Sequence, residues 1–266
     1  GTKEYLSYFK MGLPTGTGDV EKSSGNFLYE QTDFEISNGK LDYGMDRTYM
    51  SKSEKLSMVG RGFMDSYHKE LYTKGDNIYF LNSDGNTYLF TKETDGTYTN
   101  QETKDFTLEP IESGYKITTK DDTVYTFNSF GQLVETSEPN GYTLTNEYDD
   151  SGRLTSVISN ENNLNDESID FTYKTDDTHM YLLDEIALPD GSKVSYQYND
   201  DNLTSVTRSN QDSSCVTCQY GYDNNKKMNQ VLDGEGNIYG IQYENGKVSS
   251  VTYPNGEKYN FAYTNT

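Results

Sequence analysis

Alanine and tryptophan are scarce in this chain, and their scarcity excludes whole classes of structure. Of 266 residues only Ala187 and Ala262 are alanine, and tryptophan is absent. Alanine is the strongest helix former, whereas the abundant Tyr, Thr, Asn, Gly and Asp favour strands and tight turns. An all-helical fold is therefore excluded, and we expect short strands joined by turns.

Positive charge is also scarce. Only four residues are arginine, and 22 Lys and Arg stand against 43 Asp and Glu, which gives a formal net charge of −21 and a pI near 4.3. Binding to a nucleic-acid backbone requires clustered Lys and Arg that displace counterions. We predict no nucleic-acid partner and interpret the acidity as a source of solubility. Calcium is the alternative, but neither the segment 82–85 nor the segment 233–237 supplies a 12-residue loop with a terminal Glu.

Long apolar runs are missing as well. No run approaches the roughly 18 residues of a membrane span, and no charged-then-apolar leader opens the sequence. We therefore expect no membrane insertion, and we expect any export signal to lie outside this segment. The repeats described below run to Tyr263 without a cap, so we interpret the chain as a piece of a longer protein.

Leu, Ile, Val and Phe together make up less than a fifth of the chain. With high net charge, such a proportion is typical of disordered proteins. The 25 tyrosines argue against disorder, because each can bury a large ring while its hydroxyl stays hydrated or finds a partner. We predict a folded domain whose core is built from tyrosine.

Turn signals divide the chain into short hairpins. Type I′ turns need positive φ at both central residues, which Asn, Asp and Gly tolerate best. Between the turns lie runs with aromatic residues two positions apart, which places them on one face of a strand. The dipeptides that predict these turns are Asn-Gly at 38, 140, 245 and 255, and Asp-Gly at 84, 95, 190 and 233.

The hairpins repeat at intervals of 20 to 25 residues. A unit of that length is a single hairpin, too small to bury its own face, so the units must stack into one continuous sheet. A short segment of the form Leu-x-x-Val follows each aromatic run. Residues three apart face opposite ways on a regular strand, so either both faces are covered or a bulge intervenes. The aligned aromatic positions are Phe127, Tyr148, Tyr173, Tyr198, Tyr222, Tyr243 and Tyr263.

The best copy of the unit resembles a known repeat. Tyr148-Asp149 is followed by Gly152-Arg153-Leu154 and then by Val157, which resembles the YD repeat of the Rhs family: Tyr-Asp, two or three residues, Gly-Arg-Leu and Thr-x-Val. Weaker copies have lost the arginine. We predict a structural role for the motif residues Tyr148, Asp149, Gly152, Arg153, Leu154, Val157, Tyr198, Tyr222, Tyr243 and Tyr263.

Residues 24 to 71 resemble the domain that opens the repeat region in Rhs proteins. The matching pieces are Ser24-Gly25-Asn26-Phe27, Thr32-Asp33-Phe34, Arg47-Thr48-Tyr49 and Gly60-Arg61-Gly62-Phe63. We therefore expect a lead-in segment at 1–23, an Rhs-opening β domain at 24–75, and hairpin repeats at 76–266 that continue from it. Within these ranges we expect a loop at 52–60, or at most one helical turn, and an exposed inserted loop at 159–168.

Residues suited to catalysis are few. His68 and His179 are the only histidines, and neither lies in a motif that indicates a poised nucleophile. Cys215 and Cys218 lack the second ligand pair of a structural zinc site, so we interpret them as two separate thiols or one local disulfide. Some Rhs relatives cleave themselves at an Asp-Pro step, which this sequence lacks. We predict no enzyme activity, no self-cleavage, no cofactor and no metal.

The resemblance implies an all-β fold in which antiparallel hairpin repeats stack into a long twisted sheet, a strip of an Rhs-type β-shell. It also implies a bacterial extracellular or cell-surface location, in a polymorphic toxin or a wall-associated protein. The function that we expect is a non-catalytic scaffold that encloses or displays a C-terminal effector. The alternative is a carbohydrate-binding module in which tyrosine rows stack on sugars. The expected partners are further repeats and an effector of the same chain, cell-surface glycans, and other copies through open sheet edges.

Overall fold

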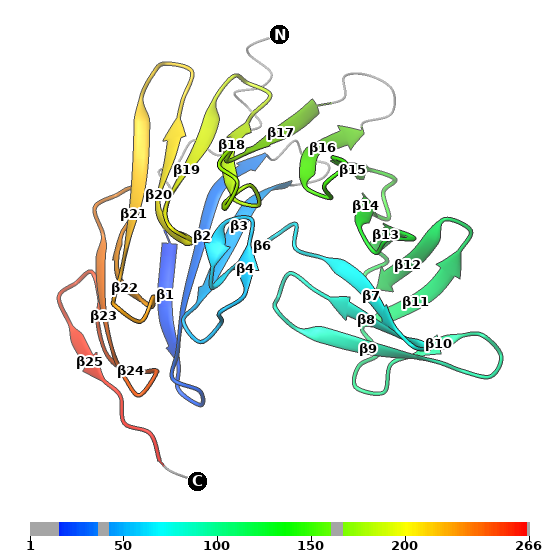
Figure 1. Cartoon of the computed structure of the whole chain (residues 1–266), viewed down its shortest axis with the longest axis horizontal. Coiled ribbons are helices and arrows are strands. Elements are labelled where there is room, and N and C mark those ends of the chain that lie inside the picture. The colour runs from blue at the N-terminus through cyan, green and yellow to red at the C-terminus, as the bar shows by residue number, and fades with distance from the viewer. Residues whose placement is uncertain (1–15, 37–42, 161–166, 265–266) are drawn as a thin grey trace. The chain divides into compact units, whose positions relative to one another are not determined.

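The computed structural model of the chain describes residues 16–36, 43–160 and 167–264, and all regular structure in these ranges is β-strand (Figure 1). The all-β prediction is confirmed. The chain divides into two compact units, which are described separately. The first contains residues 1–37, 42–65 and 171–266, and the second contains residues 38–41 and 66–170.

The first unit contains an antiparallel sheet that we call the opening sheet, with the strand order β1-β2-β3-β6. Strands β1, β2 and β3 alternate buried residues with more exposed ones, as expected of strands that pack on one face, whereas β6 is buried throughout. A short hairpin of two further strands lies between β3 and β6 in sequence. The opening sheet comprises β1 (Gly16–Glu21), β2 (Asn26–Ile36), β3 (Tyr43–Met50) and β6 (Phe63–Asp65), and the short hairpin comprises β4 (Leu56–Ser57) and β5 (Gly60–Arg61).

The second unit contains a four-stranded sheet with the order β10-β9-β8-β7. Its buried face packs into a hydrophobic cluster with strands that follow it in sequence. The sheet comprises β7 (Glu70–Lys74), β8 (Asn77–Leu81), β9 (Thr87–Lys92) and β10 (Tyr98–Thr99). The cluster comprises Leu71, Ile78, Phe80, Phe90, Leu108, Ile117, Phe127 and Leu133.

The remaining fifteen strands form one antiparallel sheet, the repeat sheet, in which β11 to β25 follow each other in sequence order. Each hairpin thus pairs with the next, and the predicted long sheet of stacked hairpins is confirmed. Its strands are β11 (Phe106–Ile111), β12 (Gly114–Thr119), β13 (Val124–Asn128), β14 (Leu133–Ser137), β15 (Thr143–Tyr148), β16 (Leu154–Asn160), β17 (Glu167–Tyr173), β18 (Leu183–Ala187), β19 (Lys193–Asn199), β20 (Asn202–Ser209), β21 (Cys215–Tyr222), β22 (Met228–Leu232), β23 (Ile238–Glu244), β24 (Lys247–Thr252) and β25 (Lys258–Asn260).

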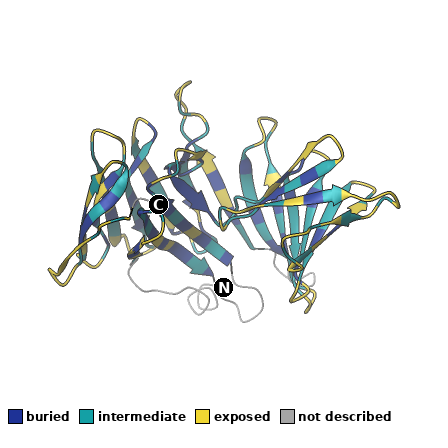
Figure 2. Cartoon of the chain, turned by 90° about the horizontal axis from the view of Figure 1, so that it is seen from below, coloured by how far each residue is buried: buried dark blue, intermediate teal, exposed yellow. Residues whose placement is uncertain are grey.

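Tyrosine contributes to the core but does not dominate it. Buried residues alternate with partly exposed ones along the strands, and the turns are largely exposed (Figure 2). Most of the buried apolar residues are Leu, Ile, Val, Phe and Met, so the prediction of a tyrosine-built core is wrong as a general statement. The few aliphatic residues suffice because they are concentrated at the inward positions of the strands. The buried tyrosines are Tyr29, Tyr43, Tyr49, Tyr196, Tyr220 and Tyr239.

Most predicted hairpins form, but their turns differ from the prediction. Among the described dipeptides only Asn245-Gly246 has positive φ at both residues, as a type I′ turn requires. Elsewhere a three-residue loop recurs, closed by two backbone hydrogen bonds across its ends, with positive φ only at its last residue. This is a type I turn followed by a left-handed residue, the next most common hairpin loop. Asn38-Gly39 lies outside the described residues.

The unit Leu-x-x-Val contains a bulge, which settles the two alternatives that its spacing left open. Tyr148 pairs with Leu154 whereas Glu147 pairs with Ser156, so Thr155 is left unpaired in between. The inserted residue restores the phase of the strand, and Leu154 and Val157 are both buried. The same register shift accompanies the motif positions Phe127, Tyr198, Tyr222 and Tyr243.

Three boundaries differ from the sequence-based expectations. Strand β1 lies within the range expected as a lead-in, and β4 and β5 form a hairpin within the range expected as a loop. The inserted loop is shorter than 159–168, because β16 continues through Asn160 and β17 begins at Glu167; its centre, residues 161–166, lies outside the described residues. These strands pair through their backbones, so they form even where apolar residues are too few to show alternation, as in β1, whose single apolar residue is Val20.

Candidate functional site: a tyrosine ladder and the pocket at its end

Five motif tyrosines connect a repeat to an earlier strand of the sheet. In each case the phenol hydroxyl donates a hydrogen bond to the backbone carbonyl of the first buried residue in an earlier strand. We call this series the tyrosine ladder. Its bonds run from Tyr148 to Leu133 (2.7 Å), Tyr198 to Leu183 (2.8 Å), Tyr222 to Leu203 (2.6 Å), Tyr243 to Met228 (2.6 Å) and Tyr263 to Val248 (2.7 Å).

The ladder and the bulge act on the same residues. Tyr243 pairs across the strands with Val248 at the bulge, and the carbonyl of Val248 then accepts the hydroxyl of Tyr263. A bulge leaves backbone groups out of the regular ladder of hydrogen bonds, and the tyrosine of the next repeat supplies a donor there. The motif therefore couples the register of each hairpin to that of its neighbour.

The aspartate that follows the motif tyrosine caps the next turn. Asp149 Oδ1 accepts hydrogen bonds from the backbone N–H groups of Ser151 and Arg153, and Asp149 Oδ2 accepts one from Arg153 Nε at 2.8 Å. Gly152 takes the left-handed position of that turn, with φ 82°. Asp223 caps its turn through Asn225 and Lys227 in the same way, although its left-handed residue is Lys226. The Asp therefore performs its role without the Gly-Arg pair, because its carboxylate bonds to backbone.

Burial perturbs the ladder tyrosines. Desolvation raises the pKa of the phenols of Tyr198, Tyr222, Tyr243 and Tyr263 above the ordinary value. Each hydroxyl therefore remains protonated, and a donor, at any physiological pH. A tyrosine that binds a metal ion or acts as a catalytic base needs a lowered pKa. The raised pKa of these phenols therefore suits a structural role.

We expect Tyr243→Phe to lower the free energy of unfolding by about 1 kcal/mol, because it deletes one hydrogen bond and leaves the carbonyl of Met228 without that donor. Tyr259→Phe is the matched control, since the Tyr259 hydroxyl bonds only to Glu257 at the surface. Urea denaturation of both variants measures the difference. Equal losses would contradict a structural role for the ladder.

Arg47 joins the opening sheet to the repeats and was not singled out as a site residue from the sequence. Its side chain is fully buried, and its guanidinium donates to both carboxylate oxygens of Asp33, at 2.8 and 2.7 Å. Arg47 Nη2 also donates to the hydroxyl of Tyr220 (2.9 Å), and Tyr196 donates to Asp33 Oδ2 (2.7 Å). Its position in the sequence could have indicated this role. Arg47 alternates with Tyr43, Met45 and Tyr49 along β3, and these three residues are hydrophobic and buried.

Further contacts hold the opening sheet against repeat strands of the same unit. The hydroxyl of Tyr49 accepts the N–H of Met228 at 2.9 Å, and the N–H of Val248 donates to the carbonyl of Gly25. The ring of Tyr29 packs edge-on against those of Tyr220 and Tyr239. The inner face of these repeats is therefore covered by aromatic packing and by bonds to backbone.

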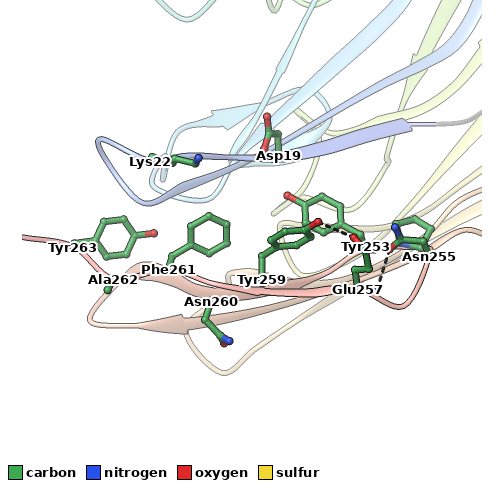
Figure 3. Close-up of a pocket in the computed structure, with 11 residues that line it drawn as sticks. Asp19, Lys22, Tyr253, Asn255, Glu257, Tyr259, Asn260, Phe261, Ala262 and Tyr263 are labelled. Atoms are coloured by element: carbon green, nitrogen blue, oxygen red, sulfur yellow. Dashed lines mark hydrogen bonds between the residues drawn. The ribbon is translucent and has the colours of Figure 1, made fainter.

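At the end of the ladder the same face is open and forms a pocket of about 880 Å³, the terminal pocket (Figure 3). Aromatic rings from β25 and its flanks line one side, and Asp19 and Lys22 lie opposite. The lining residues are Asp19, Lys22, Tyr253, Pro254, Asn255, Glu257, Tyr259, Asn260, Phe261, Ala262 and Tyr263.

Comparison with earlier repeats explains this pocket. Tyr259 lies four positions before the ladder tyrosine Tyr263 and is 50% exposed. Residues four positions before earlier motif tyrosines are all buried: Leu144, Ile169, Val194, Cys218 and Tyr239. In those repeats the inward face is covered, whereas Tyr259 carries an aromatic ring at the same position without that cover. The pocket is therefore lined at a position that is buried in the earlier repeats.

Metal-ligating groups and cysteines were the other candidates for chemistry in the described residues. Within them no group of three or more His, Cys, Asp and Glu could hold a metal ion. Both cysteines of β21 are free thiols in the structure; Cys215 is exposed, and burial raises the pKa of the Cys218 thiol to about 11, away from the thiolate needed of a nucleophile. Their different exposure agrees with opposite faces of a strand. No helix long and apolar enough to cross a membrane occurs in the described ranges.

Family comparisons agree with the repeat geometry. The family described as RHS Repeat matches residues 127–163, and a domain of unknown function, DUF6531, matches residues 18–90. The chain contains an RHS Repeat. The repeat match begins at Phe127 and includes the motif from Tyr148 to Val157, and the second match includes the range expected as the opening domain.

The chain is also similar to named nucleases. It is 25% identical to the tRNA nuclease WapA of Bacillus subtilis (strain 168) over 99% of this chain and 12% of that protein. It is 31% identical to the tRNA3(Ser)-specific nuclease WapA of Bacillus spizizenii over 58% of this chain and 6% of that protein. The chain therefore spans about an eighth or less of the length of these relatives.

Two solved structures align with most of the chain. A TcdB2-TccC3-TEV crystal structure aligns with a TM-score of 0.42 and 10% identity, over 92% of this chain and 18% of the other. A TcdB2-TccC3-Cdc42 crystal structure aligns with a TM-score of 0.40 and 10% identity, over 86% of this chain and 12% of the other.

Proposed function

We propose that this segment is a non-catalytic scaffold, a strip of the β-shell of an Rhs/YD-repeat protein that encloses or displays a C-terminal effector. The observation that carries the proposal is the tyrosine ladder, in which five motif tyrosines hydrogen bond to an earlier strand of the sheet. Such coupling propagates a sheet from hairpin to hairpin and requires no ligand. The nuclease activity named for the WapA relatives would, on this proposal, reside in a part of the longer protein outside this chain.

The terminal pocket indicates how the scaffold extends. Its rings occupy positions that are covered in earlier repeats, and the edge of β25 that does not pair with β24 has free backbone groups for one more strand. The occupant that fits is a strand with the repeat's own spacing of apolar residues, supplied by the same polypeptide in the longer protein. Pairing with the edge of a second copy is the expected substitute in the isolated chain.

The glycan-binding alternative has weaker support. A glycan platform needs accessible aromatic faces, whereas Tyr196, Tyr220 and Tyr239 of the predicted rows are buried. Of the accessible rings, Tyr259 lies in the terminal pocket, where a continuing strand would cover it, whereas Tyr72 and Phe130 lie in the second unit. A glycan array therefore serves as the discriminating measurement: binding that is abolished by Tyr259→Ala without loss of folding would favour the alternative.

We expect the isolated chain to associate at high concentration and the double variant Tyr259→Arg/Phe261→Asp to remain monomeric, because charge in the terminal pocket opposes strand addition. Leu89→Arg is the control for the introduced arginine, since it places that side chain on an exposed residue of β9. Sedimentation velocity over a concentration series measures all three. A strictly monomeric wild-type chain would contradict an adhesive edge.

Two experiments test the scaffold itself. Incubating the purified chain with tRNA should leave the tRNA intact, and cleavage would contradict the non-catalytic assignment.

In the full-length protein, Tyr259→Arg/Phe261→Asp should make the region C-terminal to residue 266 more sensitive to protease than Leu89→Arg does. Equal protection in both variants would contradict the enclosing role.

A further inference from the structure

His179 occupies an unusual position between two carboxylates. It lies in the connection between β17 and β18, and its Nδ1 is 2.7 Å from Asp176 Oδ1. Its Nε2 is 3.0 Å from Asp200 Oδ1, in the turn between β19 and β20. Ionised carboxylates only accept hydrogen bonds, so both ring nitrogens can be satisfied together only when both carry hydrogen. The geometry is therefore that of a protonated imidazolium.

This ring ties a connection to a turn of the following hairpin. The connection is closed by the backbone bond from Lys174 N–H to the Leu182 carbonyl and folds locally through bonds from His179 to Asp176 and from Leu182 to His179. The turn beyond it contains Asp200 in the left-handed region, with φ 54°. The contact from His179 to Asp200 joins residues 21 positions apart. Both residues lie outside the backbone pairing of β18 with β19.

Other charged groups surround the contact. Lys226, in the next turn along the sheet, is 3.9 Å from Asp200 and holds that carboxylate from the other side. Asp201 is paired with Arg61 of β5 at 2.8 Å, and Glu54 and Tyr181 lie near enough to act electrostatically on that arginine. Asp176 is the facing group on the connection itself. The environment is dominated by carboxylates, which favours positive charge on the ring.

We propose that His179 is a pH-operated clamp that holds the connection between β17 and β18 against the Asp200 turn when protonated and releases it when neutral. A neutral ring has one lone pair, which would face a carboxylate oxygen and repel it. One of the two contacts is then lost. The C-terminal end of the connection stays anchored by the buried Leu182 and by the backbone bond from Leu183 to Met58, so the release is confined to the part around His179, where Asp176 and Asp200 are largely exposed.

The direction of the pH dependence follows from the pKa. Hydrogen bonds to Asp200 and to Asp176 raise the pKa of His179 above its ordinary value of about 6.5. A raised folded-state pKa gives stability that is fully present below about pH 6.5 and is lost as the pH rises through the higher folded value. For Asp176, desolvation opposes the shift, but the hydrogen bonds from His179 lower its pKa. The clamp therefore stays closed below about pH 6.5 and opens as the pH rises through the raised folded-state pKa of His179.

Nuclear magnetic resonance of the whole chain tests the clamp through the ring nitrogens and the backbone amides. We expect the His179 ring to titrate above pH 6.5, and we expect the Leu182 amide, corrected for intrinsic exchange, to lose about threefold of its protection across the same titration, the size typical of an exposed ion pair. His179→Gln should abolish this pH dependence while keeping the fold.

A second variant separates the clamp from a local effect. Asp200→Asn keeps an acceptor but removes the charge, so it should move the His179 titration toward its ordinary value and shift the loss of Leu182 protection by the same amount. A ring that titrates at or below pH 6.5 in the wild type would overturn the proposal. So would protection at Leu182 that changes identically in wild type and His179→Gln.

Discussion

Replacing Arg47 with methionine is expected to lower the free energy of unfolding by about 3–5 kcal/mol, the cost of breaking a buried ion pair from one side. The substitution leaves the buried Asp33 without either of its guanidinium bonds, and the hydroxyl of Tyr220 loses its donor. Packing loss adds to this, because the guanidinium lies over the rings of Phe63 and Tyr220 at 5.2 and 5.4 Å. Chemical denaturation monitored by tyrosine fluorescence measures the change.

Two controls separate charge from packing. Arg61→Met breaks a pair that is partly exposed, with side-chain exposures of 23% for Arg61 and 10% for Asp201, and should cost about 1 kcal/mol. The double variant Arg47→Met/Asp33→Leu removes both buried charges and should recover much of the loss, because apolar replacement of a buried pair is often nearly neutral. If Arg47→Met cost no more than Arg61→Met, the buried network would not be the element that joins the opening sheet to the repeats.

Gly131→Ala is expected to lower the free energy of unfolding by at least about 3 kcal/mol. Gly131 has φ 82°, and a Cβ there would lie 1.9 Å from the backbone oxygen of Leu71. Backbone cannot move aside as a flexible side chain can, and the bond from Leu71 N–H to the Gly131 carbonyl would break. Leu71 belongs to the hydrophobic cluster of the second unit, so the displacement would reach its core.

Gly152→Ala is a closely matched control. Gly152 occupies the same position in the turn of the following repeat, also with φ 82°, but its Cβ would meet only Gln132 Nε2 at 3.5 Å. The substitution should therefore cost only the strain of a left-handed alanine, about 1 kcal/mol. Thermal and urea denaturation of the pair measure the difference. Similar losses of stability in the two variants would show that the backbone of Leu71 moves away from the new Cβ at little cost.

Local patterns predicted the fold correctly where local physics decides it. The period-two aromatic runs and the Asn-Gly and Asp-Gly signals indicated hairpins, and the 20-to-25-residue interval indicated stacking; the structure has both. The motif around Tyr148 indicated the family, and the match to the RHS Repeat includes it. These signals are reliable because turn preference and strand period depend on neighbouring residues only.

Local patterns failed where an extra residue changes the phase. The three-residue turns and the bulges each add one residue to a hairpin, and neither is visible in the alternation of apolar and polar positions. Leu154 and Val157 therefore seemed to face opposite sides, and Thr155 resolves the conflict by remaining outside the pairing. A search for Leu-x-x-Val paired with an upstream tyrosine would have found the bulge, since the two recur together.

The roles of individual side chains depended on partners far along the chain. Tyr220 lies 173 positions from Arg47, and Tyr196 lies 163 positions from Asp33, so no pattern near Arg47 could reveal whether its charge would be buried and paired. Likewise, Tyr259 has the sequence context of a covered position and yet is half exposed. By itself the sequence determined that this protein is a series of antiparallel hairpins of the Rhs/YD type. Only the tertiary structure decided which charges are buried, which tyrosines donate to a neighbouring repeat and which rings stay accessible, because burial depends on neighbours that the chain brings together only on folding.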